Sequence, residues 1–189
     1  PYMQDLNEYV KNLYLADEYI IKNPSLHAED SSWKVTKVIP LVDRLIHYSG
    51  KGRNDEINLL DVGGGAGLVL DAVSIHIEES YSIEVNKFAL DLSPRALEVQ
   101  KKANPDLKMA LNEDIRRASL GDKEIDLTLM IDILEHVPNP TQALEEVKRI
   151  SDFAIFKVPL EDNFLIRTGN FIKGGETRRH ATETSGHIN

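Results

Sequence analysis

The amino-acid sequence predicts an α/β fold with one mostly parallel sheet and helices on both faces of that sheet. From residue 57 onward, short apolar runs that suit buried strands alternate with segments of helical periodicity. These runs are apolar on both faces, which is typical of parallel strands covered by helices on each side. The 189 residues, 41% hydrophobic and 28% charged, have the length and composition of one folded domain.

Two amphipathic helices precede the first predicted strand. They cover residues 6–20 and residues 31–50, and the second has a serine at its start and a glycine at its end. Because Pro40 lacks a backbone donor and clashes with the preceding turn, we expect a kink or a break near Ile39. Together these helices form a predicted N-terminal helical lid over residues 1–50.

Five strands and three further helices follow in alternation. Two of the helices begin with a proline after Ser93 and Asn139, an order that suits a capped helix start. The predicted strands cover residues 57–62, 88–92, 107–111, 125–132 and 153–158, and the helices cover residues 66–77, 94–102 and 140–150. Residues 51–189 are therefore the predicted sheet domain.

Charge and composition exclude several classes of function. The formal charge of -9 repels a phosphate backbone, so nucleic acid is not an expected partner. No apolar run reaches the ~18–20 residues that cross a bilayer, and the start lacks a signal-peptide pattern, so we expect a cytoplasmic protein without a membrane partner. The absence of cysteine excludes disulfides, a thiolate nucleophile and cysteine-ligated zinc.

The most informative segment is the glycine-rich turn DVGGGAG, residues 61–67, between the first predicted strand of the sheet and the next helix. Such a turn exposes backbone amides to a nucleotide-like ligand, and glycines allow close approach. The Gly-x-Gly-x-x-Gly fingerprint of dinucleotide sites fails, because its third position is Leu68. A carboxylate at Asp61 repels a pyrophosphate and favours an ammonium or sulfonium group. The pattern indicates a nucleoside ligand without phosphates.

Three further segments, in the expected order, resemble the class I S-adenosylmethionine-dependent methyltransferases, which have a Rossmann-like fold. Asp91, after the second strand, matches the family's acceptor of hydrogen bonds from both ribose hydroxyls. Asp114 and Ile115 match the residues that meet the adenine amino group and pack on its ring. The segment MIDILEHVPNP, residues 130–140, resembles the small-molecule branch that includes ubiquinone-biosynthesis enzymes, where its start lines the methionine end of the cofactor.

The resemblance covers roughly residues 57–159 and implies S-adenosylmethionine as cofactor and methyl transfer to a small molecule. The implied cofactor-binding residues are Asp61, Gly63, Gly64, Gly65, Asp91, Leu92, Asp114, Ile115, Asp132 and Ile133. Asp91 and Asp114 have a second interpretation as caps of the turns that follow them. No catalytic residue is assigned, because His136 has two interpretations, as a base for an acceptor hydroxyl and as a packing residue.

Two departures from the family pattern carry further expectations. The interval from Gly67 to Asp91 exceeds the ~20 residues usual in such units, so we expect an insertion in a loop over residues 78–86. The two strands that the family adds after its fifth do not fit in full, so the sheet domain is expected to be C-terminally incomplete. Residues 163–189 and the N-terminal helices, with Trp33, would enclose the acceptor.

Three other possibilities stay open at this stage. One is an NAD-dependent oxidoreductase on a related sheet, against which Leu68 and Asp61 both count. Another is a non-catalytic cofactor-binding module, which the missing strands favour. The third concerns assembly, since the chain is compatible with a homo-oligomer. No metal site is expected, because His180 and His187 lie in a polar tail and are more simply solvated or directed at the substrate.

Overall fold

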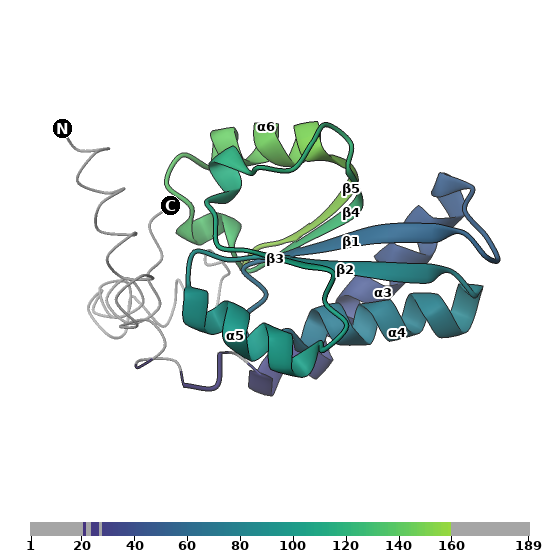
Figure 1. The fold of residues 1–189 in the computed structure, drawn as a ribbon, viewed down its shortest axis with the longest axis horizontal. Coiled ribbons are helices and arrows are strands. Elements are labelled where there is room, and N and C mark those ends of the chain that lie inside the picture. Colours follow the sequence, from purple (N-terminus) through teal and green to yellow (C-terminus); the bar gives the residue numbers. More distant parts are fainter. Residues whose placement is uncertain (1–20, 22–23, 27, 160–189) are drawn as a thin grey trace, which may run out of the picture.

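A five-stranded parallel sheet forms the centre of the molecule in the computed structural model, which describes residue 21, residues 24–26 and residues 28–159 (Figure 1). The strand order is β3-β2-β1-β4-β5. The strands are β1 (Glu56–Val62), β2 (Glu84–Leu90), β3 (Met109–Leu111), β4 (Ile125–Ile131) and β5 (Ser151–Lys157). All four strand pairs are parallel, which confirms the predicted α/β fold.

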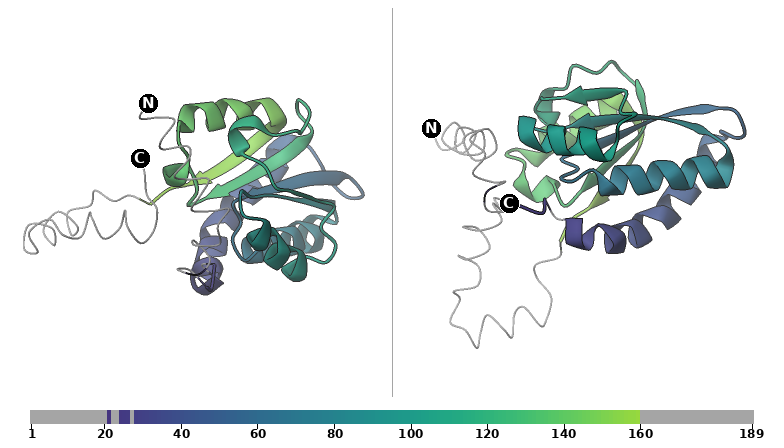
Figure 2. Two further views of the ribbon diagram at one scale, coloured as in Figure 1. Left: turned by 60° about the vertical axis from the view of Figure 1, so that its left-hand side comes forward. Right: turned by 60° about the horizontal axis from the view of Figure 1, so that its bottom comes forward.

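Helices cover both faces of this sheet. Three of them, α3 (Ser31–Ser49), α4 (Leu68–Tyr81) and α5 (Pro94–Ala103), lie on one face, and α6 (Pro140–Ile150) lies on the other (Figures 1 and 2). Short 3-10 helices η1 (Ala28–Asp30), η2 (Ile115–Arg117) and η3 (Leu134–His136) occupy the connections. This three-layer arrangement explains why the strands are apolar on both faces.

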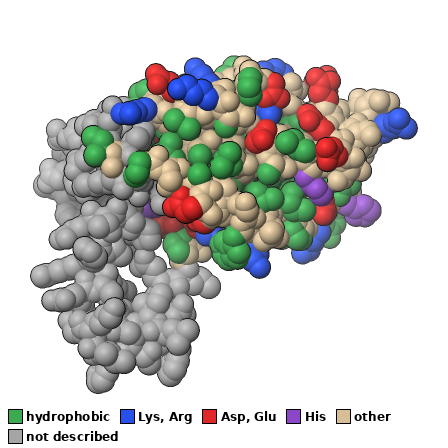
Figure 3. All heavy atoms as spheres, turned by 90° about the horizontal axis from the view of Figure 1, so that it is seen from below, with side chains coloured by type: hydrophobic (Ala, Val, Ile, Leu, Met, Phe, Trp, Pro, Cys, Tyr) green, Lys and Arg blue, Asp and Glu red, His purple; other side chains and the backbone are tan. Residues whose placement is uncertain are grey.

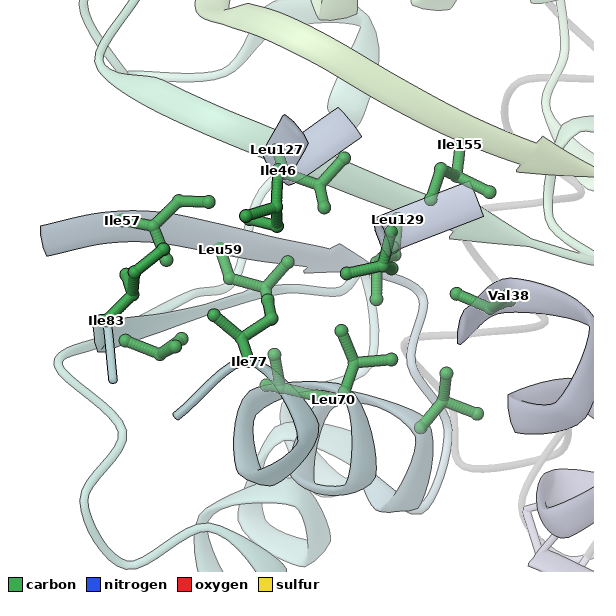
Figure 4. Packing of buried hydrophobic residues seen from close by; sticks show 14 of the residues in the cluster. Val38, Ile46, Ile57, Leu59, Leu70, Ile77, Ile83, Leu127, Leu129 and Ile155 are labelled. Atoms are coloured by element: carbon green, nitrogen blue, oxygen red, sulfur yellow. The ribbon is translucent and has the colours of Figure 1, made fainter. Parts of the chain in front are cut away.

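The core has two halves, one on each face of the sheet. Successive residues of β1 point to opposite faces, so Leu59 packs toward α3 and α4 while Leu60 packs toward α6. Figure 4 shows the first half, in which Leu70 and Ile77 of α4 face β1. Each leucine or isoleucine fully buried in this way contributes roughly 1.5–3 kcal/mol to stability. The two halves fix the position of the sheet and thus of the strand ends.

Pro40 lies inside α3, which is one helix of 19 residues, so of the kink or break predicted near Ile39 the break is wrong. The reason is packing on both sides of the proline. Val38 precedes it, Val42 and Ile46 follow it, and all three are buried in the core. Burial of three such side chains outweighs the ~3 kcal/mol that a proline costs within a helix.

The loop predicted over residues 78–86 is also wrong. Helix α4 continues to Tyr81 and β2 already begins at Glu84, so the additional residues lengthen a helix and a strand. The sequence obscures this strand because it contains Lys87, which is buried and forms an ion pair with Asp106 at 2.7 Å. A charged residue inside a strand interrupts the apolar run that marks the strand in the sequence.

Several predictions fall outside the described residues. These are the helix over residues 6–20, the acceptor-enclosing segment over residues 163–189, and the histidines His180 and His187. Within the described part of the chain, no helix is both long and apolar enough to cross a membrane. In the same part, no group of three histidine, aspartate or glutamate residues is arranged to hold a metal ion.

Candidate functional site

A cavity of about 390 Å³ opens at the carboxyl ends of the strands. It lies where the strand order reverses, since the chain continues from β1 to β2 on one side and reaches β4 on the other. Crevices at this switch point are the usual ligand sites of open α/β sheets. The residues predicted to bind the cofactor all line this cavity: Asp61, Gly63, Gly64, Gly65, Asp91, Leu92, Asp114, Ile115, Asp132 and Ile133.

The turn after β1 has no room for side chains. Gly63 and Gly65 have positive φ angles of 64° and 54°, which other residues adopt only with strain. A Cβ atom on Gly63 would lie 2.3 Å from the Ile133 side chain, and one on Gly64 would lie 2.1 Å from the Asp61 carboxylate. The turn therefore requires glycines, and it presents only backbone atoms to the cavity.

Gly67 has a different structural role from Gly63, Gly64 and Gly65. It does not line the cavity, and it caps the start of α4 with a φ of 78°. A Cβ atom there would lie 2.8 Å from Asn104 Nδ2, which donates a hydrogen bond to the Gly67 carbonyl at 3.0 Å. The fourth glycine of the turn thus makes room for the end of α5, which explains why it departs from the dinucleotide fingerprint.

Asp61 and Asp91 form a buried acidic pair in the cavity wall. Asp61 is only 1% exposed, and its Oδ2 atom accepts no hydrogen bond within the described residues. The pKa of Asp61 is raised to about 7, chiefly by burial and also by the charge of Asp91, and the Lys34 ammonium opposes both effects. Such a carboxylate is held ready for a cationic or hydrogen-bonding partner.

Asp91 is anchored by neutral donors. The Ser93 amide donates to its Oδ1 at 2.8 Å, and Gln100 Nε2 donates to its Oδ2 at 3.3 Å. The pKa of Asp91 is raised to about 6, because the effect of burial exceeds the lowering by these two hydrogen bonds. The cap of α5 is Ser93, whose hydroxyl accepts from the Ala96 amide at 3.2 Å, so the interpretation of Asp91 as the helix cap is wrong.

Asp114 caps the turn that follows it, as its second interpretation predicts, whereas its contact with adenine stays a prediction. It lines the cavity, and it caps η2 by accepting a hydrogen bond from the Arg116 amide at 2.9 Å. The Arg116 guanidinium also binds both oxygens of this carboxylate, and it reaches the Pro138 carbonyl at 3.0 Å. Asp114 thereby links the segment after β3 to the segment after β4.

Asp132 follows β4 directly and has a positive φ of 56°. Its carboxylate forms an ion pair with Lys157 at the end of β5 and lies 3.3 Å from Lys34 Nζ of α3. Lys34 also pairs with Asp30 at 3.1 Å. Glu135 and His136 of η3 line the same region of the cavity.

Sequence reasoning did not find Lys34 or Lys157, although both line the cavity. Lys34 had a usable signal, because it continues the four-residue spacing of Val38, Val42 and Ile46 along the buried stripe of α3. A lysine on a buried stripe requires a counter-charge, which indicates a polar site nearby. No pattern in the sequence around Lys157 marks it as a site residue, because its partner Asp132 follows a different strand, β4.

Residues 60–152 match a family model described as a methyltransferase domain. Among solved structures, a SAM-dependent methyltransferase from Aquifex aeolicus matches at 21% identity with a TM-score of 0.52, covering 82% of this chain and 85% of that chain. The plantazolicin methyltransferase BpumL in complex with SAH matches at 18% identity with a TM-score of 0.57, covering 82% of this chain and 62% of that chain. No curated protein matches the sequence.

Proposed function

This chain carries a methyltransferase domain and has the fold of the class I S-adenosylmethionine-dependent methyltransferases, and we propose that it transfers a methyl group to a small molecule. The observation that carries the proposal is the convergence of four separate sequence motifs on one cavity. The motifs come from segments that are far apart in the sequence. Their convergence at the strand ends is what a shared ligand requires.

The cofactor is S-adenosylmethionine, and we assign each part of this molecule to a different group of cavity residues. We assign the ribose hydroxyls to Asp91, whose carboxylate can only accept hydrogen bonds when ionised. The adenine ring is assigned to Asp114 and the buried Ile115. The methionine end is assigned to the glycine turn and to Asp132 with Ile133. These roles follow the family resemblance residue by residue.

Two observations of the site test whether its residues fit this cofactor. The glycine turn contributes only backbone atoms to the cavity wall, since Gly63, Gly64 and Gly65 have no side chains. The Asp61 carboxylate lines the cavity, and its buried Oδ2 atom accepts no hydrogen bond within the described residues, so a positively charged group of the ligand beside this wall would be attracted to it. A pyrophosphate would instead meet this carboxylate with like charge, which counts against the NAD-dependent alternative.

The protein's contribution to the reaction is alignment and desolvation. When bound, S-adenosylmethionine supplies an electrophilic methyl group on a sulfonium sulfur. In-line displacement then requires that the acceptor lone pair lies opposite the carbon–sulfur bond. By holding both reactants in this arrangement, the protein converts a bimolecular step into a unimolecular one. Ile133, Val137 and Pro138 line the cavity and exclude water from it. No general base is assigned, and His136 is positioned among these residues.

A small molecule is the proposed acceptor, on grounds of charge. The chain carries a net charge of -9. On the face formed by α3, α4 and α5, basic side chains are interspersed with acidic and hydrophobic ones, and the described part of this face has no basic patch (Figure 3). Such a surface does not attract a phosphate backbone. Membership of the ubiquinone-biosynthesis-like branch, a cytoplasmic location and a homo-oligomeric state remain predictions.

Isothermal titration with S-adenosylhomocysteine and with NAD tests the cofactor assignment. We expect S-adenosylhomocysteine to bind and NAD to give no signal. The reverse result would overturn the assignment in favour of the oxidoreductase. The D106N variant is a matched control, because Asp106 is an aspartate with a lysine partner far from the cavity, and its loss should leave both titrations unchanged.

Transfer of a labelled methyl group from S-adenosylmethionine to a panel of small hydroxyl, amine and carbon acceptors tests the activity. We expect at least one acceptor to be labelled, with release of S-adenosylhomocysteine in equal amount. Tight S-adenosylhomocysteine binding without transfer to any acceptor of a broad panel would support the non-catalytic module instead.

A further inference from the structure

Two amide side chains, one in α5 and one at its C-terminal cap, are completely buried next to the candidate site. Gln100 and Asn104 are both 0% exposed and lie one helical turn apart. Gln100 Nε2 donates to Asp91 Oδ2 at 3.3 Å, whereas Asn104 Nδ2 donates to the Gly67 carbonyl at 3.0 Å. Buried amides are costly unless they make such bonds, so each partner indicates what the amide is there to hold.

The contact of Gln100 decides how the Asp91 carboxylate is presented. An ionised carboxylate has about four acceptor positions, two on each oxygen. The Ser93 amide uses one on Oδ1 and Gln100 uses one on Oδ2, both from the protein side. Asp91 lines the cavity, so the remaining positions are available to a pair of hydroxyl donors there.

We propose that Gln100 is a positioning residue, which holds the Asp91 carboxylate ionised and oriented for the ribose diol of the cofactor. The inference rests on the proposed function, because it assigns the diol to Asp91. Gln100 itself does not line the cavity and acts through Asp91. Its effect therefore concerns cofactor affinity and the dependence of that affinity on pH.

The electrostatic surroundings support this role. The pKa of Asp91 is raised to about 6 by burial, and this value already includes the opposing effect of the Gln100 hydrogen bond. The charged groups around the Asp91 side of the cavity are Asp61 of β1 and Glu113 and Asp114 after β3, while Arg95 of α5 is exposed. Lys34 lowers the pKa of Asp61 but is not a cause of the Asp91 shift. Without the Gln100 hydrogen bond, one of the two contacts that counteract the effect of burial is lost, so the pKa of Asp91 rises.

A hydrogen-bond donor that only stabilised the fold would not move a binding pH profile, and Asn104 provides the matched comparison. It is equally buried at the C-terminal cap of the same helix, and its side chain donates to the backbone carbonyls of Gly67 and Gln100, two residues that do not line the cavity. The test is S-adenosylhomocysteine affinity, measured by isothermal titration from pH 5 to pH 9, for the full chain and for the variants Gln100→Met and Asn104→Leu.

Binding requires an ionised Asp91, so affinity is present at high pH and is lost as pH falls through the pKa of this group. For Gln100→Met we expect a midpoint shifted upward by about one pH unit, the effect of one lost hydrogen bond to a charged group, and therefore about twofold weaker binding at pH 7 and about tenfold weaker binding at pH 5. Asn104→Leu should lower the unfolding temperature and leave the midpoint unchanged.

An unchanged midpoint in a folded Gln100→Met protein would overturn the positioning role, as would an equal shift in Asn104→Leu. If Gln100→Met does not fold, Gln100→Glu keeps the size and polarity of the side chain. This variant should bind at least tenfold more weakly than the full chain at pH 8, because two buried carboxylates then repel each other. Undiminished binding by Gln100→Glu would also overturn the role. If the unaltered chain itself fails to bind, the proposed function fails first.

Discussion

Two pairs of carboxylates line the same cavity and are held by different means. Asp61 and Asp91 are buried and, in the described structure, receive hydrogen bonds only from neutral donors or from none. Asp114 and Asp132 are paired with Arg116 and with the two lysines, Lys34 and Lys157. The first pair therefore retains acceptor capacity for a ligand at an energetic cost, whereas the second pair has its charge balanced by the protein.

This difference separates two kinds of contribution to a binding site. Carboxylates without cations are available to a ligand, and their pKa values are raised by burial. Carboxylates with cations position the connections between strands. Asp132 joins segments that are remote in sequence through Lys34 and Lys157, whereas Asp114 holds the neighbouring Arg116, whose guanidinium reaches the Pro138 carbonyl. The predictions below test this distinction, in order of the size of the expected effect.

The largest effect is expected for Asp61→Asn. The pKa of Asp61 is raised from 3.8 in the unfolded chain to about 7 in the folded protein. The group therefore stabilises the fold below pH 3.8, and this contribution to the free energy of unfolding is lost as the pH rises toward 7. From pH 4 to pH 8, we expect the free energy of unfolding of the unaltered chain to fall relative to the variant by roughly 2–4 kcal/mol. Urea unfolding at both pH values measures this difference. A constant difference would contradict the raised pKa.

The second prediction concerns Asp91→Ala. Loss of the carboxylate removes the proposed acceptor of two ribose hydrogen bonds, so binding of S-adenosylhomocysteine should weaken by about 1–3 kcal/mol. Isothermal titration measures the change. Glu98→Ala, at an exposed position of the neighbouring helix α5, is the control and should not affect binding. Unchanged affinity in Asp91→Ala would remove this residue from the site.

The third prediction uses Asp132→Asn, which removes a charge and keeps a residue suited to a positive φ. Within the described part of the chain, the buried Lys34 would keep its ion pair with Asp30 and the nearby charge of Asp61, and would lose that of Asp132. We expect the free energy of unfolding at pH 7 to fall by about 1–2 kcal/mol, because a poorly compensated buried cation is destabilising. Chemical denaturation tests this. A stability gain would show that the ion pair is not needed for folding.

The smallest effect is expected for Arg116→Gln. Its ion pair with Asp114 is partly exposed, and such pairs contribute less than about 1 kcal/mol. We expect S-adenosylhomocysteine affinity to decrease by no more than about fivefold, because the Asp114 carboxylate loses its tether but remains in place. An effect larger than that of Asp91→Ala would reverse the comparison between the two pairs.

The sequence predicted the site where chemistry is concentrated in short segments next to strand ends. The turn after β1, Asp91 after β2 and Asp132 after β4 each follow an apolar run, and parallel strands bring their carboxyl ends to one edge. The ten predicted residues share a cavity for this reason. Their roles toward the cofactor remain a proposal.

Other parts of the site depend on contacts that no local pattern contains. Gln100 occurs in a polar stretch of α5, and such a composition predicts exposure to solvent. It is nevertheless completely buried and contacts Asp91. Lys157 meets Asp132 only because β5 pairs with β4 in a particular register. Pro40 shows the same limit for the fold, since tertiary packing on both sides of it overrides the local preference for a break.

The packing of Leu26 against the glycine turn links ligand binding to the N-terminal part of the chain. A Cβ atom on Gly65 would lie 2.5 Å from the Leu26 carbonyl, so the backbone before η1 lies directly on the turn, and Leu26 itself lines the cavity. A ligand that contacts both segments strengthens their association by the same free energy by which their association strengthens ligand binding. Occupancy of the site and docking of this segment are consequently reciprocal, and cleavage of the chain near Leu26 becomes a measure of how much ligand is bound.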